Sequence, residues 1–257
     1  MNRKLFLFIL SILFFVGIVL FSYKLFEFGL LSILCLVIIY FVTEKYRTTV
    51  SLFLFFLLGL MMFQIGSNYI NAWGLSVEMN ILINRSFLIF IILGTVVSLI
   101  LSKQKRSVFA SFPNWSKKVT LPFHTIPLPY FLLIGLVGSS TILIPLFVQQ
   151  EMSYIKSMFL FGILFAIINA TLEEVIWRGF LLSGLKSNVS TRYAVLITSI
   201  GFGLLHLSIG IPMLLSLLFS FGGLFYAIVV LKTNSIYPAI FFHIIINLGM
   251  VFNGWII

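Results

Sequence analysis

Three ionisable side chains lie within one strongly apolar stretch of the chain, and they are the first candidates for catalytic residues. The stretch reads FAIINATLEEVIWRGFLL and contains Glu173, Glu174 and Arg178. Glu174 and Arg178 are four residues apart, so on a helix they share a face and can form an ion pair. Glu173 points about 100° away from that pair and needs another partner. A carboxylate held in such an apolar site can act as a general base.

Two histidines and an asparagine supply further polar groups within apolar stretches. His206 ends the run GFGLLH, and His243 and Asn247 lie one turn apart in IFFHIIIN, whereas the third histidine, His124, lies in a proline-rich loop. At a rise of about 1.5 Å per residue, Glu173, His206 and His243 lie roughly 18, 21 and 16 Å from the nearest cytoplasmic loops. These similar depths predict one buried site, in which His206 or His243 is the partner of Glu173.

Such buried polar groups allow two interpretations. They can link neighbouring helices by hydrogen bonds, or they can mark an ion pathway, a proton relay or a catalytic site. One isolated histidine would favour the first interpretation. Two glutamates, an arginine, two histidines and an asparagine at a common depth favour a functional site.

The elements that must position these residues are membrane-spanning helices. Of the 257 residues, 61% are hydrophobic and 9% are charged, and the mean hydropathy is +1.20, whereas soluble domains are roughly half apolar and a quarter charged. This composition excludes a soluble globule and a disordered chain, and the single cysteine, Cys35, excludes a disulfide scaffold. A spanning helix needs about 20 apolar residues. The sequence therefore predicts an all-α, polytopic transmembrane bundle of about 8–9 spans, with candidate runs at residues 5–21, 28–42, 50–70, 86–102, 131–148, 158–184, 193–208, 212–231 and 236–256.

Basic residues indicate how the chain is oriented, because cytoplasmic loops carry most of the lysine and arginine. With the N-terminus in the cytoplasm, twelve basic residues fall on the inner side, and only Lys24, Arg85 and Lys156 fall outside. We therefore expect an integral, multi-pass protein of a bacterial plasma membrane, whose first helix is not cleaved because the first alanine is Ala72. The net charge of +10 comes mostly from basic residues in the loops between apolar runs, a pattern typical of membrane orientation. The expected partner is therefore the lipid bilayer and not nucleic acid.

The chain is expected to divide at its longest polar stretch. Residues 1–106 are predicted to be an N-terminal four-helix membrane region, 107–130 a cytoplasmic linker, and 131–257 a helical core. Prolines at positions 122, 127 and 129 cannot continue a helix. The outer connection 208–212 is short, whereas the inner segments 103–130 and 185–192 are longer and basic. These lengths predict a cavity that opens toward the cytoplasm.

The polar residues of the core fall into three short motifs, each on its own apolar stretch. EEVIWR fits E-E-x-x-x-R, FGLLH fits F-x-x-x-H, and HIIIN fits H-x-x-x-N. In this order the motifs resemble those of the CAAX protease and bacteriocin-processing (CPBP, or Abi/CAAX) family of intramembrane proteases, over roughly residues 130–252. The resemblance implies that residues 131–257 are a CAAX-protease-like catalytic core. It also implies a hydrolase, an endopeptidase that cleaves a peptide or protein substrate at the membrane.

The resemblance further implies a role for each motif residue. Glu173 would be the base that activates a water molecule, and His206 would help to hold that water. His243 and Asn247 would stabilise the oxyanion of the tetrahedral intermediate. The supporting residues would be Glu174, Arg178 and Phe202.

The sequence leaves metal dependence open. Glu173, His206 and His243 could hold a zinc ion with one open position, and the family is often described as metalloproteases. The chain contains no H-E-x-x-H motif, and a metal-free glutamate mechanism fits the same residues, so a site without a tightly bound metal is slightly favoured over a zinc site.

Two other functions compete with proteolysis. One is a membrane scaffold, or a bacteriocin-immunity or regulatory protein, that uses the same fold. The other is a proton-coupled transporter with Glu173 and His243 in a relay, although no pair of broken helices in corresponding halves is visible. The substrate is not identified, since a prenylated C-terminal motif, a leader peptide and a signalling peptide all fit.

Overall fold

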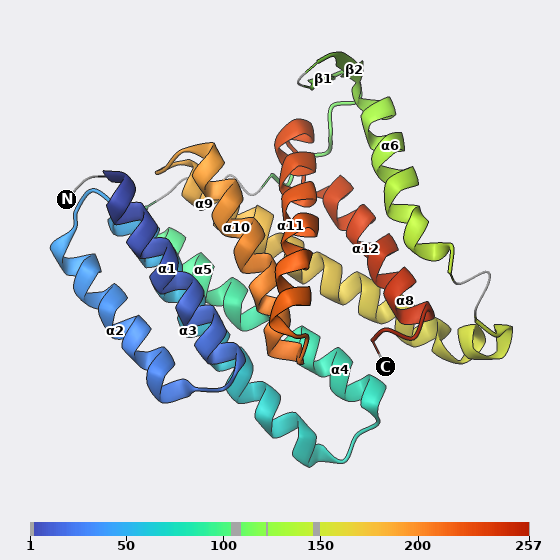
Figure 1. Ribbon diagram of the computed structural model, residues 1–257, viewed down its shortest axis with the longest axis horizontal. Coiled ribbons are helices and arrows are strands. Elements are labelled where there is room, and N and C mark those ends of the chain that lie inside the picture. The colour runs from blue at the N-terminus through green and yellow to red at the C-terminus, as the bar shows by residue number, and fades with distance from the viewer. Residues whose placement is uncertain (1–2, 104–108, 122, 146–149, 257) are drawn as a thin grey trace.

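Helices make up nearly all of the structure, a computed structural model that describes residues 3–103, 109–121, 123–145 and 150–256. Figure 1 shows them side by side in one bundle, with a small hairpin at one end. The longer helices are α1 (Arg3–Ser22), α2 (Phe26–Val42), α3 (Arg47–Ile70), α4 (Val77–Ser86), α5 (Ile89–Leu101), α6 (Leu128–Ser140), α8 (Met152–Glu174), α10 (Thr191–Leu205), α11 (Met213–Thr233) and α12 (Tyr237–Phe252). The shorter elements are η1 (Asn71–Trp73), β1 (Lys118–Thr120), β2 (Thr125–Pro127), η2 (Thr141–Leu143), η3 (Val175–Leu182), α9 (Ser183–Lys186) and η4 (His206–Ile209).

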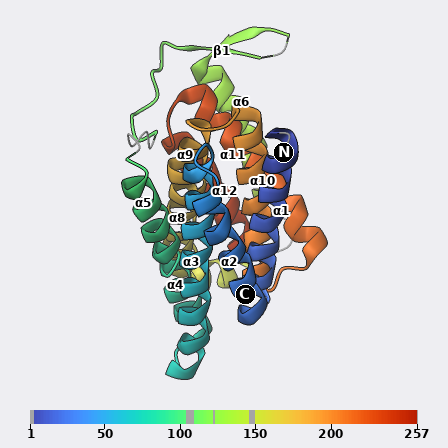
Figure 2. The same cartoon turned by 90° about the vertical axis from the view of Figure 1, so that its left-hand side faces the viewer.

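The predicted polytopic all-α bundle is confirmed. Within the described residues, six helical segments are long and apolar enough to cross a membrane, at residues 3–22, 47–70, 77–101, 152–186, 191–209 and 213–233. Shorter apolar helices at 26–42, 128–143 and 237–252 account for the other three predicted runs. The end of the run 131–148, together with Lys105, Arg106 and Pro122, lies outside the described residues. In Figure 2 the start of α1 and the hairpin lie toward one end of the bundle, and the C-terminus lies toward the other.

Large apolar side chains cover the outside of the bundle as well as its core. Phe8, Phe28 and Phe41 are all exposed, which suits helices that face lipid. Inside, the ring of Phe14 stacks on Phe53 with centroids 4.1 Å apart. The buried ring of Trp177 in η3 lies 5.0 Å from that of Phe56 in α3. Aromatic packing thus joins the N-terminal helices to the C-terminal ones.

Helices α3 and α5 approach closely because glycine lies at their contact. A Cβ atom added at Gly59 would lie 2.6 Å from the Cα of Ile91, and one added at Gly94 would clash with the carbonyl oxygen of Phe55. Small residues let helix backbones approach in this way within membranes. Since α5 also contacts η3, this packing places the α4–α5 segment beside the centre of the C-terminal helices.

The position of Arg85 corrects the sequence-based orientation count, which assigned it to an outer loop. Helix α4 begins at Val77, where the Ser76 hydroxyl accepts a hydrogen bond from the Met79 N–H, an N-cap contact. Arg85 therefore lies about two turns inside a helix, and it is buried. The apolar run was predicted to start only at residue 86, and the turns before it contain Glu78, Asn80 and Asn84. Only Lys24 and Lys156 then remain in the count for the predicted outer side.

The predicted linker also contains structure that its composition did not reveal. Strands β1 and β2 pair antiparallel, with Val119 opposite Ile126. The Lys232 ammonium at the end of α11 donates a hydrogen bond to the carbonyl of Thr120, at 2.5 Å. Pro129 lies in the first turn of α6, where a missing N–H costs nothing. The hairpin is therefore held against the C-terminal helices.

Candidate active site

The residues of the three motifs come from five elements that meet in the bundle. Glu173 and Glu174 end α8, and Arg178 lies in η3, which continues α8 as a π-helix. Phe202 lies in α10, His206 opens η4, and His243 and Asn247 lie on α12. All of these side chains except His206, which is half-buried, are buried. The wider π-helical turn was not predicted, and such turns are frequent at functional sites.

Glu174 and Arg178 form the ion pair that their spacing predicted. The Arg178 Nη1 atom donates to Oε1 of Glu174 at 2.9 Å, and both side chains are fully buried. Arg178 Nη2 also donates to the carbonyl of Gly223 at 2.8 Å. Its guanidinium carbon lies 4.7 Å from the ring centroid of Phe202 and 5.2 Å from that of Tyr226. The pair therefore ties η3 to α10 and α11.

Glu174 has a second partner that its motif did not indicate. Its Oε1 atom also lies 3.0 Å from Nδ1 of His243 on α12. Because this oxygen already accepts from Arg178, it is the acceptor and Nδ1 of His243 is the donor. The Nε2 atom of His243 then faces Glu173, at 3.8 Å from Oε2. Glu174 thus orients the imidazole, as a carboxylate orients histidine in other active sites.

Glu173 lies between two charged or polar partners. One is His243, which the sequence offered as a candidate. The other is Arg85 of α4, whose Nη1 atom lies 3.9 Å from Oε1 of Glu173. Neither contact is short enough to be a hydrogen bond, and Oε2 of Glu173 is buried without a hydrogen-bond partner. This carboxylate oxygen is therefore free to accept a hydrogen bond from a water molecule.

Arg85 is the site residue that the sequence analysis missed. It was assigned to a loop, so it was never compared with the depth of Glu173. The sequence did contain a signal for a helix that starts before the apolar run. Ser76 is a typical N-cap residue, and Glu78 lies in the first turn that follows, where an acidic side chain is favoured. With that start, an arginine lies inside a membrane helix, where it needs an anionic partner.

Aromatic rings of α11 hold both imidazoles. The ring of Phe219 stacks on His206 with centroids 4.4 Å apart and planes at 14°. Two helical turns further on, the ring of Tyr226 stacks on His243 at 4.8 Å and 17°. Phe202 contacts both imidazoles edge-on, at 5.1 and 5.7 Å. The sequence identified Phe202 from its motif but not Phe219 or Tyr226, because nothing in the sequence distinguishes these two from the many other aromatic residues of this chain.

Helices α10 and α11 must pack closely for these contacts. A Cβ atom added at Gly223 would lie 2.8 Å from the carbonyl oxygen of Ser199, and one added at Gly203 would clash with the backbone of Ser216. Because these two glycines have no side chains, α11 lies close to α10. This packing brings the rings of Phe219 and Tyr226, and the Gly223 carbonyl that accepts from Arg178, against α10.

His206 has a defined orientation. Its Nδ1 atom lies 2.9 Å from the carbonyl oxygen of Phe202, four residues earlier. A carbonyl only accepts, so Nδ1 carries the hydrogen and Nε2 has a free lone pair when the ring is neutral. The F-x-x-x-H motif therefore describes a local contact, in which residue 202 supplies both a ring and a carbonyl to the histidine.

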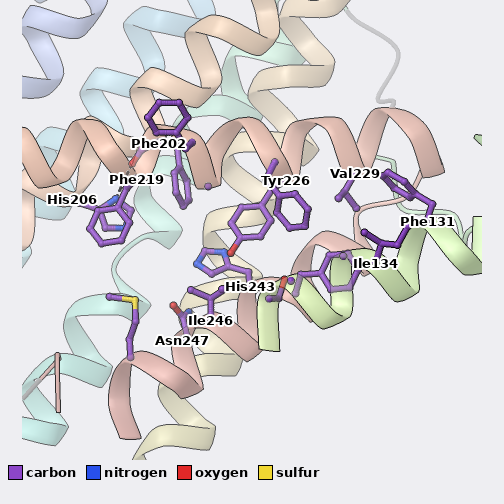
Figure 3. A pocket seen from close by; sticks show the side chains of 18 of the residues that line it. Phe131, Ile134, Phe202, His206, Phe219, Tyr226, Val229, His243, Ile246 and Asn247 are labelled. Carbon is purple, nitrogen blue, oxygen red and sulfur yellow. Dashed lines mark hydrogen bonds between the residues drawn. The ribbon is translucent and has the colours of Figure 1, made fainter. Parts of the chain in front are cut away.

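A cavity of about 520 Å³ lies against these residues. Its wall includes His206, His243 and Asn247, and the remaining wall is largely apolar and aromatic, from α6, α11, α12 and the hairpin. Figure 3 shows His206 beside Phe219, and His243 beside Tyr226, with Asn247 next to them. The Nδ2 atom of Asn247 is buried and has no hydrogen-bond partner in the described chain. Glu173 reaches this wall through His243.

The proposed zinc ligands do not form a metal site in the described part of the chain. No group of three or more histidine, cysteine, aspartate or glutamate side chains there lies close enough to hold a metal ion. Glu173, His206 and His243 therefore do not constitute a ligand set. The nearest partners of Glu173 are a guanidinium and an imidazole.

One family comparison matches the region that contains the site. Residues 155–249 match the model of a family described as type II CAAX prenyl endopeptidase, Rce1-like. The matched region contains all three motifs, whereas Arg85 lies outside it. Comparison with curated proteins and with solved structures gives no match. Over residues 155–249, the chain is therefore similar to the type II CAAX prenyl endopeptidase (Rce1-like) family.

Proposed function

We propose that the protein is an intramembrane endopeptidase in which Glu173 activates water for attack on a peptide carbonyl. The observation that carries the proposal is the buried Oε2 atom of Glu173, which has no hydrogen-bond partner and lies 3.8 Å from a histidine of the cavity wall. Polar contacts of this length are often bridged by water. A water held there would lie between the carboxylate and a substrate in the cavity.

The surrounding groups have complementary roles in this proposal. Glu173 accepts a proton from the attacking water and later returns it to the leaving nitrogen, as a general base and acid. Nε2 of His206 accepts a hydrogen bond from the same water, because Nδ1 is bonded to Phe202. No step requires a metal ion.

The oxyanion would be stabilised by donors on α12. Asn247 offers an unpaired Nδ2 donor next to the cavity. His243, whose Nδ1 is bonded to Glu174, would present Nε2 to the oxyanion and donate to it when that nitrogen carries a proton. Donors fixed in advance within a dry site are the largest single source of catalysis in many enzymes.

The cavity suggests the class of substrate. Apart from the polar residues above, its wall consists mainly of groups such as Phe131, Ile134 and Phe225, which favour an apolar ligand. We propose a peptide that carries a large apolar group next to the bond that is cut. A prenyl group, as in the description of the matched family, is one such group.

The test uses the purified full-length protein in lipid nanodiscs with a pool of short peptides, half of which carry a lipidated cysteine. Products are identified by mass spectrometry in H₂¹⁸O, and hydrolysis is expected to place one ¹⁸O atom in the new carboxylate. Asn247→Leu is expected to lower kcat by about 10²–10³-fold, as loss of one oxyanion donor does elsewhere, with little change in KM. Ile246→Leu, which alters the same wall, serves as the control.

Two outcomes would contradict the proposal. If the wild type cuts no peptide in the pool and none in native membranes, a scaffold function becomes the better interpretation. If Asn247→Leu and Ile246→Leu have the same kcat, Asn247 does not stabilise the oxyanion.

We propose further that the cavity opens toward the cytoplasm. Leu121 and Ile126 of the hairpin segment line it, and the hairpin lies toward the end of the bundle where α1 starts (Figure 2). The excess of lysine and arginine at this end favours the cytoplasmic side.

Accessibility of single cysteines tests this orientation. In a Cys35→Ser background, which removes the one exposed native thiol, a cysteine at Ile126 is expected to react with a charged thiol reagent in inverted vesicles but not in intact cells. A cysteine at the exposed Ala72 in η1, at the other end of α3, is expected to show the opposite pattern. Labelling of Ile126→Cys only in intact cells would reverse the proposed orientation.

A further inference from the structure

Arg85 is a buried cation that comes from outside the region matched by the family. It lies on α4, whereas the match spans residues 155–249. Its side chain is 6% exposed, and its Nη1 atom lies 3.9 Å from Oε1 of Glu173. The other carboxylate oxygen of Glu173 faces Nε2 of His243 at 3.8 Å. Arg85 and His243 therefore contact different oxygens of the same carboxylate.

A chain of hydrogen bonds holds Arg85 in this place. Its Nη2 atom donates to Oδ1 of Asn84 at 2.7 Å, and Nδ2 of Asn84 donates to Oγ of Ser67 at 2.7 Å. The Ser67 hydroxyl donates in turn to the carbonyl of Phe63 at 2.8 Å. The guanidinium also lies 5.8 Å from the ring centroid of Phe63. Two N-terminal helices, α3 and α4, thus fix the direction of the guanidinium.

With His243 neutral, the charges of the site balance only when Arg85 is included. Glu174 is neutralised by Arg178 at 2.9 Å, so Glu173 would otherwise be an unneutralised carboxylate among buried side chains. Charged groups in membrane helices are costly unless they are paired. Within the described residues, Glu173 is the acid that forms an ion pair with Arg85. The pairing therefore benefits both side chains.

We infer that Arg85 is a positioning residue for the proposed base, supplied to the site by the N-terminal helices. It holds Oε1 of Glu173 through an ion pair, which leaves Oε2 directed toward His243 and the water. Arg85 is not in the cavity wall, so it acts through Glu173 and does not touch the substrate. The inference rests on the function proposed above for Glu173, and it makes the N-terminal helices part of the working site.

The first test compares Arg85→Met with Arg85→Lys in the peptide assay. Arg85→Met is expected to lower kcat by about 10- to 100-fold, the size of effect seen when a reacting group is misplaced by about 1 Å, while KM stays within about twofold because the cavity wall is intact. Arg85→Lys keeps the charge and is expected to recover most of the loss. Arg47→Met is the matched control, because Arg47 contacts the ring and carbonyl of Tyr40 and is expected to have no effect.

A second test does not depend on any substrate. Dicyclohexylcarbodiimide is an apolar reagent that modifies protonated carboxyl groups, and its attachment to Glu173 can be measured by mass spectrometry. Labelling is expected to be faster in Arg85→Met than in the wild type or Arg85→Lys, because only Arg85→Met removes the cation that faces Oε1 of Glu173. This result would stand even if no peptide were cleaved, so it separates the inference from the proposed function.

Three outcomes would overturn the inference. The first is a wild-type kcat in Arg85→Met. The second is a kcat in Arg85→Lys as low as in Arg85→Met when the two variants are equally stable. The third is carbodiimide labelling of Glu173 in Arg85→Met at the wild-type rate. If Arg85→Met does not fold, Asn84→Leu takes its place, because it removes the acceptor that orients the guanidinium and keeps the charge. It is expected to lower kcat several-fold, with KM unchanged, and an unaltered kcat would also count against the inference.

Discussion

Replacing Glu173 by glutamine is expected to lower kcat/KM by about 10²–10⁴-fold, the range that general base catalysis supplies. Glutamine keeps the size of the side chain but cannot take a proton from water. The contacts of Glu173 with Arg85 and His243 are 3.9 and 3.8 Å long, so the substitution breaks no hydrogen bond of the described chain. The variant leaves Arg85 without its anionic partner, so a lower melting temperature is expected, but the protein should still insert and fold, and the loss of activity should appear mainly in kcat.

The measurement is steady-state cleavage of one defined peptide by purified protein, together with the melting temperature in detergent. Glu27→Gln is the matched control, because Glu27 is an exposed residue of α2 and the same chemical change there should have no effect on kcat. Cleavage by Glu173→Gln at the wild-type rate would show that Glu173 is not the base.

Replacing Glu174 by alanine is expected to lower the free energy of unfolding by about 3–5 kcal/mol, as for other broken buried ion pairs. This loss is expected to exceed the loss in Glu173→Ala. The change leaves the fully buried Arg178 with only the Gly223 carbonyl as a hydrogen-bond acceptor and removes the acceptor of His243 Nδ1. Glu173→Ala loses two longer contacts and should destabilise the protein less.

The double variant Glu174→Ala/Arg178→Ala distinguishes the pair from two separate effects. Removing both charges should restore part of the melting temperature lost in Glu174→Ala, because no unpaired charge then remains. Activity should not return, since His243 still lacks the carboxylate that orients it. A double variant whose losses simply add would mean that the two side chains are not coupled.

The sequence alone was sufficient for those features that depend on composition and on neighbours along the chain. The number of apolar runs follows from composition, because each run must be long enough for a bilayer. The Glu174–Arg178 pair follows from a spacing of four on one helix, and the Phe202–His206 contact also joins residues four apart. Depth along the helices correctly predicted that Glu173 and His243 would meet.

Contacts between helices could not be predicted in the same way. The hydrogen bond from His243 to Glu174 joins residues 69 positions apart. The sequence also does not distinguish Phe219 and Tyr226 from the other aromatic residues of a chain with thirty phenylalanines. Which ring stacks on a histidine depends on the rotation of α11 against α10, and that rotation is set by the close approach at Gly203 and Gly223.

Arg85 shows most clearly what only the tertiary structure decided. Its position in the chain allowed a loop or a helix end, and the positive-inside pattern was satisfied by either. Burial against Glu173 depends on the close packing of α5 on α3 at Gly59 and Gly94, which brings α4 beside α8. Local spacing determines which side chains share a helix face, but the ion pair between distant helices forms only where packing brings a cation and a carboxylate together away from water.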